Sequence, residues 1–167
     1  MKCFLPALIL WSVQPCLAAE FLLPAKQQGI VVDVAQKKLF FFPGDGSNIV
    51  SVFPVAVRRP GIPKKSFTTE VFDKVENPMW RPSDKMRERM RRKGQRLSRI
   101  VRPGPHNPLG KYAIYLNNPR HIIIHGTNEP ESIGTSASSG CVRMYEEDIK
   151  VLFDTVSIGT QVTVIDD

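Results

Sequence analysis

Short runs of β-branched and aromatic residues, separated by turn residues, recur along the chain and constrain its fold more than any other feature. Such runs are typical of β-strands, because their side chains pack well on a pleated surface. They lie at residues 29–35, 38–43, 49–57, 66–75, 112–116, 121–124 and 160–166, with Phe67, Val71 and Phe72 as expected core residues. The first two runs are expected to form a hairpin. The sequence therefore predicts a mainly β fold.

One segment near the C-terminus has a helical period instead. Ile149, Leu152, Phe153 and Val156 recur at i, i+3, i+4 and i+7, which gives an apolar stripe along residues 146–156. The acidic residues that open this segment suit a helix N-terminus, where the macrodipole is positive. At 167 residues, the chain is long enough for one domain with a core and too short for two of ordinary size.

Residues 78–108 differ from the rest because they are rich in proline and positive charge. Nine Lys or Arg residues lie between Lys85 and Arg102, against a single Glu. Ser83 is a candidate N-cap for a short polar helix that Gly94 would end. A solvated helix face explains such a run most simply, and attraction to an anionic polymer is the alternative. Because the segment is poor in core residues, we expect a lid across the sheets, over a substrate cleft.

The N-terminus has the features of a secretory signal peptide. Lys2 precedes an uncharged stretch, residues 3–19, and the small residues at its end suit cleavage. An uncleaved anchor is the alternative, although Pro6 and Pro15 bracket a stretch too short to span a bilayer comfortably. We expect residues 1–19 to be removed and residues 20–167 to form one exported domain without a membrane span. Export argues against a nucleic-acid partner, as does the lack of aromatic residues for base stacking in the basic segment.

Cleavage would leave Cys141 as the only thiol, because Cys3 and Cys16 depart with the signal. A lone thiol in an exported protein cannot form an internal disulfide and is either reactive or buried. It cannot make a cysteine-based metal site by itself, and the three histidines show no ligand spacing. We therefore expect no metal and no cofactor.

The stretch HIIIHGTNEPESIGTSASSGCVRM, residues 121–144, carries the candidate chemistry. It places His125 after an apolar run and Cys141, 16 positions later, in a turn flanked by Gly140. An imidazole that takes the thiol proton yields the reactive thiolate, and a glycine lets backbone N–H groups approach a reacting carbonyl. Arg143 could bind a substrate carboxylate with its fork of donors. A buried structural cysteine and a hydrogen-bonded histidine are the alternative.

If His125 activates Cys141, two physical consequences follow. The imidazole should lie within hydrogen-bond reach of the sulfur, and the pKa of the thiol should fall below its free value of about 8.5. Arg143 would be costly to bury without an anionic partner, so we expect it to position substrate more than to stabilise the fold.

The residues IHGTN, followed at this spacing by S-x-G-C-V-R, closely resemble the signature of L,D-transpeptidases, cysteine enzymes that cross-link peptidoglycan. The resemblance extends over residues 20–167, through matching segments at 29–43, 77–82, 103–116 and 148–166. It points to the branch found in Gram-negative envelope proteins. It implies a β-sandwich of mixed sheets with one or two helices, an active-site cleft beneath a capping segment, and a periplasmic location.

The resemblance also implies a role for each residue of the motif. Cys141 matches the nucleophile and His125 the general base, with the carbonyl of Gly126 orienting the imidazole. The S-x-G-C-x-R pattern comprises Ser138, Gly140 and Arg143, with an oxyanion hole formed by backbone N–H groups at 140–141. One departure is Ser139, which stands where many members carry histidine.

In this family the cysteine attacks the L-centre of the third residue of a peptidoglycan stem tetrapeptide, releases D-alanine and passes the acyl group to an amine. The acceptor could be another stem peptide, a lysine of an envelope lipoprotein or a free D-amino acid, and carbapenem-type β-lactams are the implied acylating reagents. A hydrolase that trims peptidoglycan and a non-catalytic wall-binding protein are the alternatives. Non-catalytic relatives usually lose the nucleophile or the base, and this chain has both.

Overall fold

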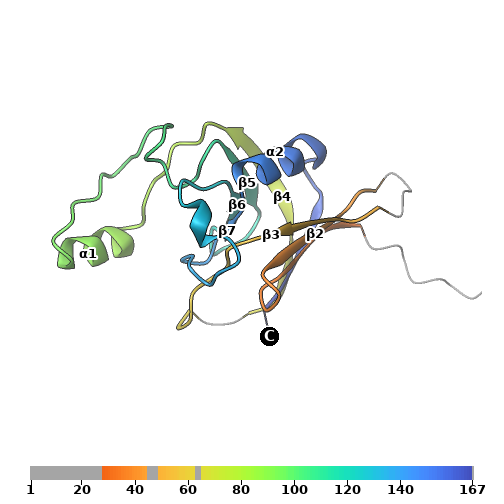
Figure 1. Cartoon of the computed structure of the whole chain (residues 1–167), viewed down its shortest axis with the longest axis horizontal. Coiled ribbons are helices and arrows are strands. Elements are labelled where there is room, and N and C mark those ends of the chain that lie inside the picture. The colour runs from red at the N-terminus through yellow and green to blue at the C-terminus, as the bar shows by residue number, and fades with distance from the viewer. Residues whose placement is uncertain (1–27, 45–48, 63–64, 167) are drawn as a thin grey trace, which may run out of the picture.

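The computed structural model describes residues 28–44, 49–62 and 65–166, so the expected signal peptide lies outside the described residues. Within them, eight strands form one continuous mixed sheet in the order β3-β2-β1-β8-β4-β5-β6-β7 (Figure 1). The strands are β1 Gly29–Asp33, β2 Lys38–Phe42, β3 Ser51–Pro54, β4 Phe67–Glu76, β5 Tyr112–Leu116, β6 Ile123–His125, β7 Val142–Arg143 and β8 Gln161–Ile165. The α-helices are α1 Asp84–Arg92 and α2 Glu146–Thr155, and Pro130–Ser132 forms a short 3₁₀ turn. The predicted mainly β class with two helices is confirmed.

Strand β4 joins the two parts of the sheet. Its first half pairs antiparallel with β8, and its second half pairs antiparallel with β5. The register shifts between Val71 and Asp73, and such a bulge bends a strand and increases its twist. The sheet curls far enough that Ala56, beyond β3, pairs with Arg143 of β7 at the opposite edge. The two expected layers are therefore the two parts of one curled sheet.

An apolar core lies between the two parts of the sheet and α2. It is built from apolar side chains of all eight described strands or their flanks and of α2: Ile30, Val32, Leu39, Phe41, Phe53, Val55, Val57, Val71, Ile114, Leu116, Ile124, Val142, Met144, Ile149, Leu152, Val156, Val162 and Val164. Helix α2 packs on β5, and its predicted apolar stripe faces this core. Burial of this amount of apolar surface is the main force that holds β6, and with it the candidate site, in place.

Two local predictions were wrong, and both have a physical cause. Phe72 was expected in the core but is 65% exposed, because it is the unpaired residue of the β4 bulge. The strand expected at 121–124 begins two residues later, since His121 has a positive φ of 52° and cannot continue a ladder.

The excursion that carries α1 is fixed at its base. Trp80 and Val101 exchange both backbone hydrogen bonds, each 2.9 Å long, and so tie its two arms together. Asn107 is fully buried, and its amide donates to the Pro78 carbonyl at 2.7 Å while its oxygen accepts from the Leu109 N–H at 2.9 Å. These contacts satisfy the buried amide and tie the two ends of the excursion together.

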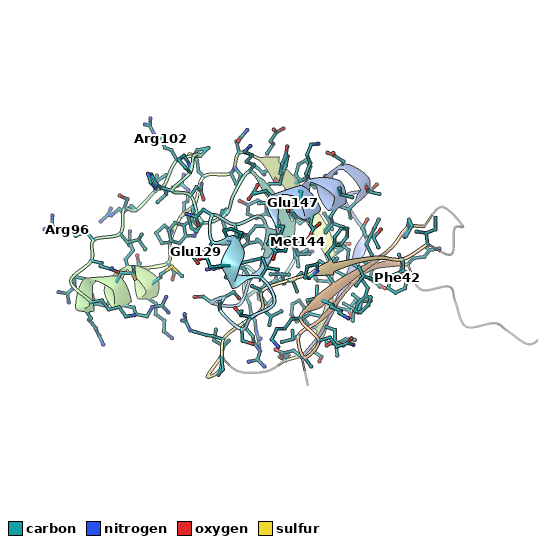
Figure 2. All side chains as sticks on the ribbon, viewed as in Figure 1. Phe42, Arg96, Arg102, Glu129, Met144 and Glu147 are labelled. Carbon is teal, nitrogen blue, oxygen red and sulfur yellow. The ribbon has the colours of Figure 1, made fainter. Side chains whose placement is uncertain are left out.

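Helix α1 itself stands away from the sheet at the end of the excursion (Figure 1). It begins as predicted, with the Ser83 hydroxyl accepting from the Met86 N–H at 3.2 Å, and none of its residues is buried. Figure 2 shows the exposed side chains of Arg96 and Arg102 at the outer edge of this excursion. No helix in the described ranges is long and apolar enough to cross a membrane.

Candidate active site

The turn that carries Cys141 is shaped by Ser138, which is only 1% exposed. The Ser138 hydroxyl donates to the Cys141 carbonyl at 2.6 Å and accepts from the Gly140 N–H at 3.1 Å. Gly140 has a φ of 133°, in the region that favours glycine. The turn is therefore preformed. In this resting geometry the Gly140 N–H is already bound, so it is not free to meet a reacting oxygen.

His125 lies at the end of β6 and is 4% exposed. Its Nδ1 lies 2.5 Å from the Gly126 carbonyl oxygen. Because a carbonyl only accepts, Nδ1 carries the proton and Nε2 keeps its lone pair. The pKa of His125 is lowered to about 4, mainly by burial; the Gly126 hydrogen bond opposes this shift, and the Arg143 charge contributes to it. At neutral pH the imidazole is uncharged and able to accept a proton.

Strands β6 and β7 bring the histidine and the cysteine into neighbouring rows. His125 is the register partner of Arg143 in the parallel pair of β6 and β7. Cys141, two residues before Arg143, therefore lies beside Ile123 and on the same face of the sheet as His125. Rows two residues apart along a strand are separated by roughly 6.6 Å. The Arg143 charge acts on both the imidazole and the thiol. The two reactive groups are thus diagonal neighbours.

The expected contact and the expected thiol pKa are not found in this resting site. Among the hydrogen bonds of the described residues, none joins the His125 ring to the Cys141 sulfur. Burial raises the pKa of the Cys141 thiol, and a backbone hydrogen bond from Ile123 and the Arg143 charge only partly oppose this. The prediction of a lowered thiol pKa is wrong, because a neutral imidazole supplies no positive charge to stabilise a thiolate. The resting pair is neutral.

The side chain of Arg143 is held by two residues of the preceding loop. Its Nη1 donates to the Glu129 carboxylate at 2.6 Å and to the Ser132 hydroxyl at 3.2 Å, and its side chain is 17% exposed. Glu129 is therefore the anionic partner that burial of this arginine requires, and sequence reasoning did not identify it. The available signal was an acidic residue in the loop between His125 and Cys141. Within the described hydrogen-bond network, the Nε and Nη2 donors of Arg143 make no bond.

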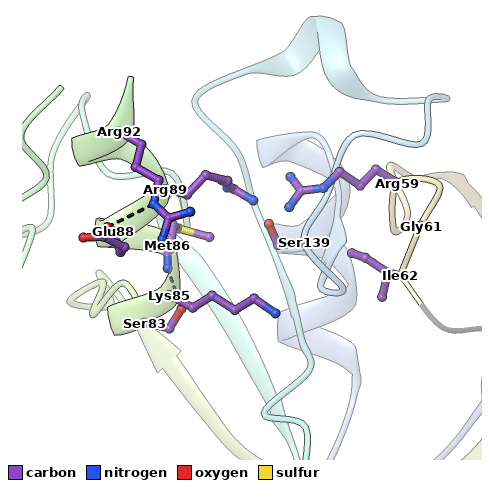
Figure 3. A pocket seen from close by; sticks show the side chains of 10 residues that line it. All are labelled: Arg59, Gly61, Ile62, Ser83, Lys85, Met86, Glu88, Arg89, Arg92 and Ser139. Atoms are coloured by element: carbon purple, nitrogen blue, oxygen red, sulfur yellow. Dashed lines mark hydrogen bonds and ion pairs between the residues drawn. The ribbon is translucent and has the colours of Figure 1, made fainter. Parts of the chain in front are cut away.

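Ser139 lies on a basic groove of about 590 Å³ between α1 and the loop that follows β3. The groove is lined by Arg59, Gly61, Ile62, Ser83, Lys85, Met86, Glu88, Arg89, Arg92 and Ser139. Figure 3 shows the side chains of Lys85 and Arg89 extending from α1 towards Ser139. Four lining side chains are cationic and one is anionic, so the groove attracts negative charge. Sequence reasoning found the basic helix but not Arg59, which faces it from the other wall.

No cluster of three or more potential ligands (His, Cys, Asp or Glu) in the described ranges could hold a metal ion. The side chains of the site itself offer a thiol and a neutral imidazole, and the basic groove adjoins them at Ser139, two residues from Cys141. This set can transfer an acyl group through a thioester, because a positioned imidazole can remove and return the proton.

The neutral pair predicts how Cys141 reacts with iodoacetamide. Because the pKa of the thiol is raised, the thiolate fraction should be small at neutral pH, and the alkylation rate should rise steeply above about pH 8.5. Mass spectrometry of the peptide that contains Cys141, at a series of pH values, measures this rate. A plateau between about pH 5 and 8 is the signature of a thiolate–imidazolium pair and would contradict the neutral assignment.

Comparison with known proteins shows which family the chain matches. Residues 27–164 match the L,D-transpeptidase catalytic domain, YkuD. A probable L,D-transpeptidase ErfK/SrfK of Escherichia coli is 43% identical over 141 residues, which cover 84% of this chain but 44% of that protein. This chain thus spans less than half the length of that relative. A putative L,D-transpeptidase of Fuscovulum blasticum is 35% identical over 136 residues, covering 81% of this chain and 68% of that protein.

The fold is also similar to that of solved L,D-transpeptidases. The crystal structure of L,D-transpeptidase 3 from Mycobacterium tuberculosis, in complex with a faropenem-derived adduct, superposes with a TM-score of 0.58 at 18% identity. The match covers 82% of this chain and 59% of that chain. The family match over most of the chain and the similarity to the relatives agree: the chain belongs to the L,D-transpeptidase catalytic domain family.

Proposed function

We propose that this chain is a periplasmic L,D-transpeptidase, with Cys141 as the nucleophile and His125 as the general base. The observation that carries this proposal is the tautomer of His125. Its Nδ1 proton is bound by the Gly126 carbonyl, so the basic Nε2 is free in a buried site next to the cysteine turn. Family membership supports the acyl-transfer chemistry, and the set of intact residues argues against a non-catalytic wall-binding protein.

The neutral pair determines the order of the proton transfers. As the Cys141 sulfur attacks the carbonyl of the third stem residue, His125 Nε2 takes the thiol proton and a carbon–sulfur bond forms. The imidazolium then gives this proton to the nitrogen of the departing D-alanine, which leaves a thioester. Because burial lowers the pKa of His125 to about 4, its imidazolium is a strong acid that readily protonates the leaving amine. An acceptor amine resolves the thioester and returns a proton through the same ring.

The remaining motif residues would support this reaction in different ways. Ser138 fixes the turn from inside, and Ser139 faces the groove through which substrate would approach. The oxyanion would be stabilised by backbone N–H groups of the turn at 140–141, after a small adjustment that releases the Gly140 N–H from Ser138. The unbonded Nε and Nη2 donors of Arg143 are suited to a substrate carboxylate.

The basic groove suits a substrate that bears carboxylates, as stem peptides do. We propose that the excursion of residues 78–108 forms one wall of the substrate site and limits access of water to the thioester. Export directed by residues 1–19 would bring the domain to its substrate. The acceptor would be another stem peptide or a lysine of an envelope lipoprotein, with water as the alternative of a trimming hydrolase.

The reaction itself gives the first test. Purified protein incubated with stem tetrapeptides and an amine should release D-alanine and form the cross-linked product, whereas Cys141→Ala should form neither and remain folded. Mass spectrometry of the products and thermal melting measure both outcomes. His125→Asn should slow acylation by faropenem strongly, by about 100-fold or more, because it cannot accept the proton. Cross-linking by folded Cys141→Ala would eliminate the mechanism, and hydrolysis without cross-linking would identify the hydrolase.

Arg143 gives a second test, because its two proposed tasks can be separated. Arg143→Ala removes the donors for substrate and also the contact with Glu129, whereas Glu129→Gln weakens only that contact. Both variants should lose roughly 1 kcal/mol of stability or less, because Glu129 is half exposed. Only Arg143→Ala should lower kcat/KM, by at least about tenfold. Equal losses in both variants would make Arg143 a structural brace alone.

The groove predicts that basic residues lining it and basic residues elsewhere on the excursion differ in their effect on substrate binding. Replacing Lys85, Arg89 and Arg92 with Gln removes three charges from the groove, and replacing Arg87, Arg91 and Arg96 removes three from elsewhere on the excursion. The groove set should raise KM for a small muropeptide by about tenfold, which corresponds to roughly 1.4 kcal/mol. The second set should weaken only the action on intact wall, at low salt. Equal effects of both sets on the muropeptide would contradict a substrate groove.

A further inference from the structure

The carboxylate of Glu146, the first residue of α2, lies against the loop that follows His125. Its Oε1 accepts from the Thr127 N–H at 2.8 Å, and its Oε2 accepts from the Lys111 N–H at 3.0 Å. None of the ion pairs between described residues includes Glu146. Its negative charge is therefore directed onto two peptide groups and not onto a cation.

Two glycines make room for this carboxylate. A Cβ atom added to Gly110 would lie 1.7 Å from Oε1, and one added to Gly126 would lie 2.0 Å from the same oxygen. Any side chain at either position would push the carboxylate out of its place. The absence of a Cβ at Gly126 thus allows a negative charge to approach the backbone directly next to the candidate base.

One peptide group connects Glu146 with His125. The N–H of the Gly126–Thr127 peptide donates to Glu146, and the carbonyl of the same peptide accepts from His125 Nδ1 at 2.5 Å. A trans peptide is planar, so holding its N–H also sets the direction of its carbonyl on the opposite side. A negative charge at the N–H end polarises the group and makes its carbonyl oxygen a stronger acceptor.

We propose that Glu146 is a positioning residue of the active site, which acts on His125 through the Gly126–Thr127 peptide. This inference rests on the proposed role of His125 as the base. The carboxylate does not touch the ring, but it keeps the carbonyl aimed at Nδ1 and stabilises the imidazolium that forms when Cys141 gives up its proton. It thereby counteracts the positive charge of Arg143 on β7, which disfavours the imidazolium. On β5 the register partner of His125 is Ala113, which carries no charge.

A purely structural role is the competing explanation, because Glu146 also ties α2 to two loops. The variant Glu146→Gln separates the two, since it keeps the size of the side chain and removes the charge. Glu147→Gln is the matched control: it makes the same change in the same first turn of α2, and its side chain is exposed. Both variants alter the helix macrodipole equally, so this effect cancels in the comparison.

The experiment measures melting temperature, kcat and KM for stem-peptide transfer, and the proton NMR signal of His125 Nδ1–H in the ¹⁵N-labelled full chain. The signal is assigned with His125→Asn. We expect Glu146→Gln to lower kcat by about 10- to 100-fold with KM nearly unchanged, the size of loss seen when outer-shell partners that orient metal-bound histidines are removed. The Nδ1 proton should move upfield because its hydrogen bond weakens. Glu147→Gln should leave kcat and the Nδ1 signal as in the wild type.

An Nδ1 signal that stays in place in a folded Glu146→Gln protein would overturn the proposal, as would an unchanged kcat. If Glu146→Gln does not fold, Glu146→Asp replaces it. Its carboxylate is one methylene too short to reach both N–H groups, so the same upfield movement is expected, and its absence overturns the proposal. The NMR signal requires no turnover. A protein that proves inactive on stem peptides would therefore refute the proposed function while still testing the link between Glu146 and His125.

Discussion

The backbone pairing between residues 55–59 and the cysteine turn is the constraint on which the rest of the site depends. Ala56 exchanges two hydrogen bonds with Arg143, of 2.9 and 3.0 Å, and the Ser138 N–H donates to the Val57 carbonyl at 2.9 Å. On its other side, β7 pairs parallel with β6. The turn therefore belongs to the curled sheet although it looks like a loop in the sequence. A preformed turn loses little conformational entropy when substrate binds, which is what a precise reacting geometry requires.

Burial by the same sheet determines the charge state of the reactive groups. It lowers the pKa of His125 and raises that of Cys141, and both shifts favour the uncharged forms. A neutral, buried thiol is less susceptible to oxidation and alkylation than an exposed thiolate. The cysteine turn thus borders the apolar core through Val142, and the basic groove adjoins it at Ser139.

Much of the fold follows from local pattern. The hairpin of β1 and β2, the N-cap at Ser83 and the apolar stripe of α2 depend on neighbouring residues, and the structure contains each of them. Phe72 shows the limit of such reasoning. Alternation along a strand cannot reveal a bulge, since the bulge arises where β4 changes its partner from β8 to β5. The short β7 was also missed, because two residues carry too weak a pattern to be recognised as a strand.

The sequence by itself determined the mainly β class, the candidate cysteine and histidine, and the family. Each of these conclusions depends on short sequence patterns, which can be recognised without knowing the tertiary contacts. Only the tertiary structure decided which charges act on those residues. Glu146 meets the Lys111 N–H across 35 positions, Glu129 reaches Arg143 across 14, and the curled sheet, not any local motif, brings each pair together. The charge state of the reactive pair was likewise decided in three dimensions, because a pKa responds to burial, and burial is a property of the packed chain.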